Sequence, residues 1–265
     1  MKNKVFSTFK EAVADIPDDS VIMLHSFSGP VGIAQNLIKA LKEHGAKGLT
    51  LIGCNLGQIS GVGMLEYQKE SAAEIPGLTE RMDATGLYSI ILGQSYTTPS
   101  ILIENGQVKK GITCWAGTSV VGIESPLEKA VKNGEVELEM VPQGTMAERI
   151  RAGGAGLGGF YSPVGVETVY QEGKEKRMIQ SREYLFETPL KADFGFVRAY
   201  KADLMGNLVY RGSSRSYNPL IATAAKITIA EVDEIVEPGD LDPESIITPG
   251  IFVDRIVKIG QGEMK

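Results

Sequence analysis

Near its N-terminus the chain contains the pattern of a strand, a helix and a second strand in succession. Residues 21–24 read Val-Ile-Met-Leu, a continuous apolar run typical of a strand that is buried on both faces. A helix is expected over residues 33–43, with Gly45 as its C-terminal stop, and a second strand over residues 49–54. Such a unit joins parallel strands by a right-handed crossover and places ligands at their carboxyl ends. The sequence therefore predicts an α/β protein with an open mixed or parallel sheet flanked by helices.

A helix that leads into a glycine-rich stretch lies between residues 141 and 165. Thr145 and Glu148 have the spacing of a capping box, which predicts a helix that begins at Thr145 and stops at residues 153–154. Glycine inside regular structure costs about 0.5–1 kcal/mol relative to alanine, so we expect this backbone to approach a ligand or another chain closely. A flexible connector is the alternative. The stretch also holds apolar residues that a solvated linker does not need, namely Leu157, Phe160 and Tyr161.

The remaining elements follow from hydrophobic periodicity and turn residues. Helices are expected over residues 6–16, 64–73, 126–132 and 219–225. Strands are expected over residues 88–92, 113–116, 136–141, 183–187, 194–201, 208–211 and 226–236. The strand at 208–211 is expected to pair with 194–201 through the turn at 205–207, and the tail to dock through residues 251–253. Without a low-complexity linker or internal repeat, residues 1–265 are expected to form a single domain.

Composition restricts the classes of partner. Of the 265 residues, 43% are hydrophobic and 23% are charged, as in an ordinary globular protein. The net charge of −6 argues against a nucleic-acid surface and against binding to anionic membranes, but it does not exclude an anionic ligand held by backbone amides. Cys54 and Cys114 lie in apolar runs and read as buried thiols in a reducing compartment. With no signal-peptide core and no long apolar stretch, the chain is expected to be cytoplasmic.

A set of motifs runs through the second half of the chain. They are Gln143-Gly144-Thr145, residues 149–156, residues 160–165, Glu172-Gly173-Lys174, residues 198–203, Gly206-Asn207, Asn218-Pro219, Glu231-Val232, residues 234–239 and residues 248–253. Together they resemble the A subunit of family I CoA-transferases, a family that includes the 3-oxoacid and acetate CoA-transferases. The resemblance is dense over residues 135–258, recognisable over 15–55 and lacking over about 58–98. We interpret 58–98 as an insertion that covers a sheet edge or contributes to an oligomer contact.

The resemblance implies the CoA-transferase fold, which sugar-phosphate isomerases share, and the exchange of CoA between an acyl-CoA and a free carboxylic acid. In that family the acyl-CoA is attacked by a glutamate of the B subunit, which gives an anhydride and then a glutamyl-CoA thioester. The implied partners are therefore a B subunit, an acyl-CoA and a carboxylic acid, with coenzyme A entering as a thioester substrate and no resident cofactor. No catalytic residue is assigned to this chain.

Glu104 lies in a short sequence that is similar to the glutamate motif of the B subunit. Residues 104–106 read Glu-Asn-Gly, but Ile103 stands where the family has serine, and the A-subunit resemblance continues on both sides. The alternative is a helix C-terminus, with Leu102 and Ile103 packed and residues 105–106 as a left-handed stop. We favour the helix end and expect the nucleophile to come from a partner chain.

The loop after the first buried strand is the expected substrate contact of an A subunit. The family has Gly-Gly-Phe here, followed by glycine and proline, whereas this chain keeps only the phenylalanine and a glycine-containing turn. The candidate binding residues are Ser26, Phe27, Ser28, Gly29, Pro30, Val31, Gly32, Asn55, Gly154 and Gly156. Free amides at the start of helix 33–43 are expected to face the strand ends. The two serines either donate hydrogen bonds to a carboxylate or satisfy the turn.

Several other residues have a structural and a functional interpretation. His25 lies near this loop and is expected to be a satisfied core or turn residue rather than a functional one. Arg149 and Arg151 suggest an interface or a solvated face, and Trp115 suggests core. No spacing of His, Cys, Asp and Glu predicts a metal site.

Two other functions remain open from the sequence. The strand–helix–strand start and the glycine-rich loops also fit a sugar-phosphate isomerase or a ligand-sensing regulator of similar fold, which would bind a phosphosugar without a partner. The altered glycine loop further allows an interaction protein that has lost its chemistry.

Overall fold

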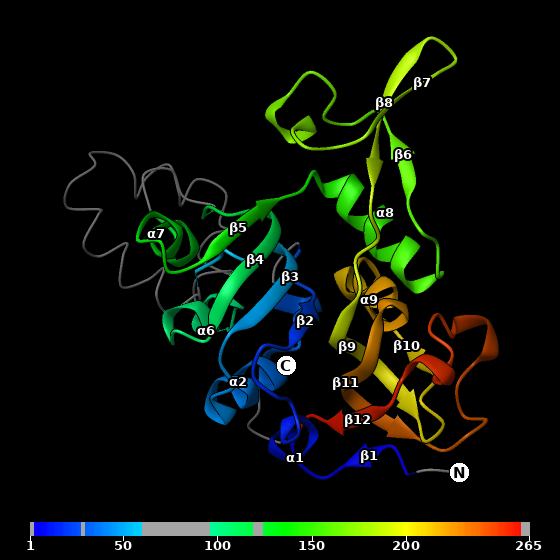
Figure 1. Ribbon diagram of the computed structural model, residues 1–265. Helices are drawn as coiled ribbons and strands as arrows, with labels where there is room; N and C mark the ends of the chain where they lie inside the picture. Colours follow the sequence, from blue (N-terminus) through cyan, green and yellow to red (C-terminus); the bar gives the residue numbers. More distant parts are fainter. Residues whose placement is uncertain (1–2, 28–29, 60–95, 119–123, 261–265) are drawn as a thin grey trace, which may run out of the picture.

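The computed structural model describes residues 3–27, 30–59, 96–118 and 124–260. Its main feature is a nine-stranded sheet of order β1-β12-β11-β9-β2-β3-β4-β5, with β10 paired to β9 (Figure 1). The strands are β1 (Val5–Phe6), β2 (Val21–Leu24), β3 (Leu49–Asn55), β4 (Val108–Trp115), β5 (Glu137–Met140), β9 (Ala192–Asp203), β10 (Leu208–Val209), β11 (Ala225–Val236) and β12 (Arg255–Lys258). All these pairings are parallel except the one between β10 and β9. The predicted open mixed or parallel sheet is confirmed.

Helices cover both faces of this sheet (Figure 1). They are α1 (Phe9–Val13), α2 (Gln35–His44), α6 (Ser100–Glu104), α7 (Pro126–Lys132), α8 (Gln143–Gly154) and α9 (Asn218–Ala224). Strand β2 shows why two layers form, since Ile22 and Leu24 join the core under α1, α2, α6 and α7 while Met23 joins the core under α8 and α9. Side chains alternate between the faces of a strand, so a continuous apolar run fills both cores.

A small antiparallel sheet extends from the end of α8 (Figure 1). It consists of β6 (Phe160–Ser162), β8 (Arg182–Glu187) and β7 (Lys176–Ile179), in that order. We call residues 157–187 the arm. Strand β8 was expected from the sequence, whereas β7 was missed because its side chains are largely exposed and follow no clear alternation.

Local signals correctly placed some of the helix ends. Gly45 closes α2 with a left-handed φ of 82°, and Ser125 with Glu128 forms a capping box at the start of α7. The turn into β10 brings Leu208 opposite Ala202, as the expected hairpin requires.

The expected start of α8 at Thr145 is wrong. The helix begins at Gln143, directly after Pro142 redirects the chain, so Thr145 falls inside the first turn and faces the core. Its hydroxyl is buried and has no hydrogen-bond partner among the described residues. The helix ends at Gly154, with Ala155 as its C-cap, which confirms the expected stop at residues 153–154.

The two chain ends also differ from the expectation. Residues 5–6 form β1 beside β12, because parallel pairing with the C-terminal strand outweighs helix propensity, and α1 starts only after the Thr8 cap. Within 251–253, Val253 is buried but Ile251 is 85% exposed. The tail docks mainly through β12. The expected helix 64–73 and strand 88–92 lie outside the described residues, as does most of the segment 58–98, whose interpretation as an insertion stays a prediction.

No helix in the described ranges is long and apolar enough to cross a membrane.

Candidate active-site edge

The carboxyl ends of β2, β3 and β4 meet at one edge of the sheet, because these strands are parallel neighbours. Here the loop that leaves β2 is bonded to the tip of β3. The backbone amide of Asn55 donates to Ser26 Oγ at 2.9 Å, and Gly57 N–H donates to Asn55 Oδ1 at 3.2 Å. Ser26 is almost fully buried and therefore serves the turn. The structure thus brings together Ser26 and Asn55, two of the predicted site residues.

His25 lies directly beneath this loop. Its side chain is 1% exposed, and its Nε2 atom lies 2.9 Å from the hydroxyl of Ser216. A Cβ atom at Gly32 would lie 2.3 Å from the imidazole ring, so only glycine allows the loop to pass over the histidine. Burial lowers the pKa of His25 to about 4, and the ring is therefore neutral at neutral pH. This position supports the interpretation of His25 as a core and turn residue, but the ring is not fully satisfied, because its Nδ1 is buried without a hydrogen-bond partner among the described residues.

The buried His25 should make stability depend on pH. Its folded-state pKa of about 4 lies below its unfolded value of 6.5, so the unfolded chain binds the proton first. The contribution of His25 is present above pH 6.5 and is lost as the pH falls toward 4, by about 3 kcal/mol at most. Urea unfolding at pH 7 and pH 4 should show this loss in the wild type and much less of it in His25→Gln. The exposed His44→Gln is the control and should behave like the wild type; an equal pH effect in both variants would contradict the assignment.

Aromatic side chains also lie at this edge of the sheet. The ring of Tyr217 lies 6.1 Å from that of Phe27 and 6.5 Å from the imidazole of His25, between centroids. The Tyr217 hydroxyl donates to the carbonyl of Gln143 at 3.1 Å. Tyr217 therefore joins the loop after β2 to the start of α8.

Trp115 is 56% exposed, so its expected place in the core is wrong. It is the last residue of β4, opposite Asn55, where the strand extends past the packed helices. Its indole donates to the Thr118 carbonyl at 3.4 Å. An exposed indole at the strand ends adds an apolar surface to the candidate site.

The first turn of α2 is not free to bind an anion, contrary to expectation. Glu231 of β11 accepts from the amides of Asn36 and Leu37 at 2.9 and 3.1 Å, and Asn36 Nδ2 donates to its other oxygen at 2.9 Å. Burial raises the pKa of Glu231 to about 7, while Arg198 and these amides oppose the rise. The side chain of Glu231 thus already occupies the positive, N-terminal end of this helix.

Asn218 fixes the far side of the loop. It is fully buried, and its amide donates to the carbonyls of Gly32 and Ser214, both at 3.0 Å, while its oxygen accepts from the backbone of Arg198. A cavity of about 440 Å³ lies beside it. This cavity is lined by Val31, Arg198, Ala199, Tyr200, Arg211, Ser214 and Asp233. Of the predicted loop residues, Val31 therefore faces an open, partly basic cavity.

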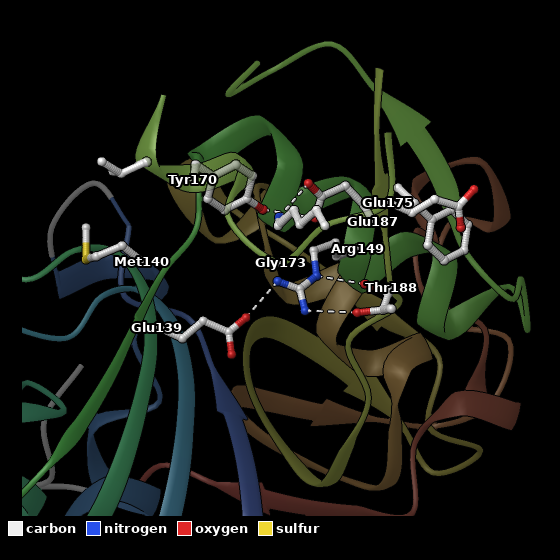
Figure 2. A pocket seen from close by; sticks show the side chains of 11 residues that line it. Glu139, Met140, Arg149, Tyr170, Gly173, Glu175, Glu187 and Thr188 are labelled. Carbon is white, nitrogen blue, oxygen red and sulfur yellow. Dashed lines mark hydrogen bonds and ion pairs between the residues drawn. The ribbon is translucent and has the colours of Figure 1, made fainter. Parts of the chain in front are cut away.

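A second cavity, of about 540 Å³, lies where the arm meets β5 and α8 (Figure 2). Arg149 crosses it, donating to Glu139 at 2.9 Å and to the carbonyl of Thr188 at 2.7 Å. Glu187 accepts from Tyr170 at 2.9 Å and from Lys174 at 2.7 Å. The expected solvated role is wrong for Arg149, which is 7% exposed, because its guanidinium joins β5 to the segment that follows the arm; an interface role stays a prediction. Arg151 is exposed and pairs with Glu148.

The predicted glycines at the end of α8 lie apart from the loop. A Cβ atom at Gly154 would lie 2.2 Å from Thr223 Oγ1, so Gly154 packs against α9. Gly156 instead has a φ of +72° and open space around it. Tyr217 touches the loop from the start of α9, whereas Thr223 lies near its end, about 9 Å further along the axis. The close approach seen here is to the chain itself, and the expected approach to a ligand or another chain stays a prediction.

The other predicted residues are placed as follows. The backbone of Pro30, Val31 and Gly32 forms a short 3-10 turn. Ser28 and Gly29 lie outside the described residues. Glu104 ends α6, followed by Gly106 at a φ of +65°, with Leu102 and Ile103 buried, which confirms the helix-end interpretation. Among the described residues, no group of three or more His, Cys, Asp or Glu side chains could hold a metal ion.

Sequence reasoning assigned no role to Tyr217, Arg198, Asn218 or Glu231. Arg198, Asn218 and Glu231 belong to the motifs that carry the family resemblance. The sequence therefore indicated these positions, but it did not show which residues they contact. Those contacts join segments that are far apart in the chain.

Comparison with known proteins agrees with this architecture. The sequence model of the family described as "Coenzyme A transferase" matches residues 80–259. The chain is 40% identical over 259 residues to the A subunit of the 3-oxoadipate CoA-transferase of Pseudomonas putida, covering 98% of this chain and 95% of that protein. It is 39% identical over 254 residues to the A subunit of a probable succinyl-CoA:3-ketoacid coenzyme A transferase of Bacillus subtilis, covering 96% and 89%. The chain belongs to the coenzyme A transferase family.

A solved structure has the same fold. The structure of an acyl-CoA transferase from E. coli O157:H7 superimposes with a TM-score of 0.72 at 19% identity, over 97% of this chain. The chain spans 47% of that longer protein. This protein is thus an enzyme of the CoA-transferase class and corresponds to the A subunit. Between the functions left open by the sequence, the family match favours the CoA-transferase over the isomerase or regulator.

Proposed function

We propose that this chain is the A subunit of a heteromeric CoA-transferase that exchanges CoA between an acyl-CoA and a free carboxylic acid. The observation that carries the proposal is the 40% identity to the A subunit of a CoA-transferase over nearly the whole chain. The partner is a B subunit, whose glutamate attacks the thioester carbonyl. The resulting acyl anhydride is opened by the CoA thiolate to give a glutamyl-CoA thioester and the free acid.

The side chains at the strand ends support a nucleophile from the partner. Among the described residues that directly follow β2, β3 and β4, namely 25–27, 56–59 and 116–118, none carries a carboxylate. Glu231 is fully buried and committed to α2. The edge offers instead hydroxyl, amide and aromatic groups, which suit the binding and orientation of an acyl group beside a partner's carboxylate.

We propose that residues 27–32 and Asn55 contact the substrate and that the exposed Gly156 lies toward the partner. Ser26 and Gly154 are already committed to contacts within the chain. Coenzyme A enters and leaves as substrate, and we propose no resident cofactor. The two free thiols favour a reducing compartment, so we place the enzyme in the cytoplasm.

The proposal is tested by intact mass, measured after the chain and its B subunit have been incubated with a panel of acyl-CoAs. We expect a CoA adduct only on the B subunit. The same adduct should form when Glu104→Gln replaces the wild-type chain. An adduct on this chain that Glu104→Gln abolishes would show that the assignment to the A subunit is wrong. Failure of the pair to transfer CoA from any acyl-CoA tested would favour an interaction protein that has lost its chemistry.

A further inference from the structure

The two cysteines of the chain are lateral neighbours at the active-site edge. The register of β3 and β4 pairs Gly53 with Thr113 and Asn55 with Trp115, which places Cys54 opposite Cys114. Both side chains pack in the core beneath α8 and α9, so they point to the same side of the sheet. Neighbouring strands lie about 4.8 Å apart, within the range of Cα–Cα distances that a disulfide bridges.

The surroundings make the two thiols unequal. The neighbouring Cys114 lowers the pKa of the Cys54 thiol, with a smaller contribution from Tyr217 and against the opposing effect of burial, while the pKa of Cys114 is raised. Cys114 also lies 3.3 Å from the sulfur of Met146. Cys54 is buried and Cys114 is partly exposed, so solvent reaches the pair on the side of Cys114. A thiolate is the reactive form of cysteine, which makes Cys54 the better nucleophile of the pair.

We propose that Cys54 and Cys114 form a redox-active dithiol that peroxides oxidise to a reversible intramolecular disulfide. The Cys54 thiolate attacks one peroxide oxygen, the O–O bond breaks, and the departing hydroxide takes a proton to become water. The sulfur of Cys114 then attacks the Cys54 sulfenic acid, the S–O bond breaks, and a second water leaves with the Cys114 proton. Two thiols and one hydrogen peroxide thus give one disulfide and two waters.

The strand geometry predicts a disulfide that is readily reduced. The strand spacing of about 4.8 Å exceeds the Cβ–Cβ distance of about 3.8 Å in a relaxed disulfide, so the bond must draw the two strands together. Strained disulfides have higher reduction potentials and are the labile ones. Because Cys54 and Cys114 directly precede Asn55 and Trp115, closing the bond shifts the strand ends at the candidate site.

The inference is tested on the wild-type chain without any substrate, so its outcome is independent of the proposed CoA transfer. The chain is treated with hydrogen peroxide, denatured, alkylated with N-ethylmaleimide and weighed intact. We expect a mass lower by two hydrogen atoms with no maleimide bound, and two maleimides bound after dithiothreitol. Because the chain has only two cysteines, an intramolecular disulfide must join them. Two free thiols, disulfide-linked dimers, or added oxygen in place of a disulfide would each overturn the proposal.

Two serine variants identify the attacking thiol. Cys114→Ser keeps a hydrogen-bond donor beside Cys54 and should accumulate a sulfenic acid that dimedone traps. Cys54→Ser is the matched variant and should react several-fold more slowly. The reverse order would overturn the role given to Cys54.

Trp115, the only tryptophan, reports on the strand ends. Its emission should change on oxidation, recover with dithiothreitol, and stay constant in both serine variants. Constant emission in an oxidised wild-type chain would overturn the link to the site.

Discussion

Glu231→Ala is expected to lower the free energy of unfolding by about 3–5 kcal/mol, because it removes the buried acceptor of three hydrogen bonds from the first turn of α2, while Arg198 keeps its ion pair with Asp233 at 2.8 Å. The carboxyl group is 1% exposed and accepts three hydrogen bonds from Asn36 and Leu37. Arg198 Nε lies 3.9 Å from it. Alanine removes all of these contacts and leaves a cavity in their place. Urea unfolding monitored by circular dichroism measures the loss.

The matched control for this variant is Glu234→Ala on the same strand. Glu234 pairs with Lys201 at 2.7 Å, but both side chains are substantially exposed, so its removal should cost less than about 1 kcal/mol. If the two variants lost similar stability, Glu231 would not be the cap of α2. Because α2 begins directly after the loop that leaves β2, Glu231→Ala should also loosen the candidate site.

Gly153→Ala is expected to destabilise the protein by about 3 kcal/mol, although alanine normally stabilises a helix. A Cβ atom at Gly153 would lie 2.0 Å from the carbonyl oxygen of Leu190. That carbonyl cannot withdraw easily, since the amide of Leu190 is bonded to the carbonyl of Arg149 at 2.8 Å. The helix and the segment that enters β9 would therefore have to separate, which thermal unfolding detects as a lower Tm.

Gly144→Ala provides the control within the same helix. A Cβ atom there meets nothing within 4 Å, so this variant should match or slightly exceed the stability of the wild type. A Gly153→Ala protein as stable as Gly144→Ala would show that the close approach at Leu190 is not required.

The parts of the fold that the sequence predicted are those with a local cause. The apolar runs of β2 and β3 identify buried parallel strands, and Gly45 and Gly106 mark helix ends because left-handed backbone favours glycine. The family motifs add the class of enzyme, because they specify residue types at fixed positions. None of these inferences requires knowledge of which distant segments meet.

Errors arose where a distant contact outweighed a local preference. Thr145 has the local pattern of a cap, but Pro142 and the packing of α8 start the helix earlier. Trp115 is apolar, yet β4 carries it past the helices to the open edge. Residues 5–6 were expected to be helical and instead pair with β12.

The sequence by itself thus determined the α/β class, the order of the buried strands along the chain and the transferase family, because periodicity, turn chemistry and motifs are local properties. Only the tertiary structure decided how the site edge is built. Glu231 caps a helix 195 residues before it, and Asn218 holds the loop at Gly32, 186 residues away. The Cys54–Cys114 pair exists because β3 and β4 are neighbours in register. Such contacts depend on which strands pair, and the identity of one residue does not reveal its partner across the sheet.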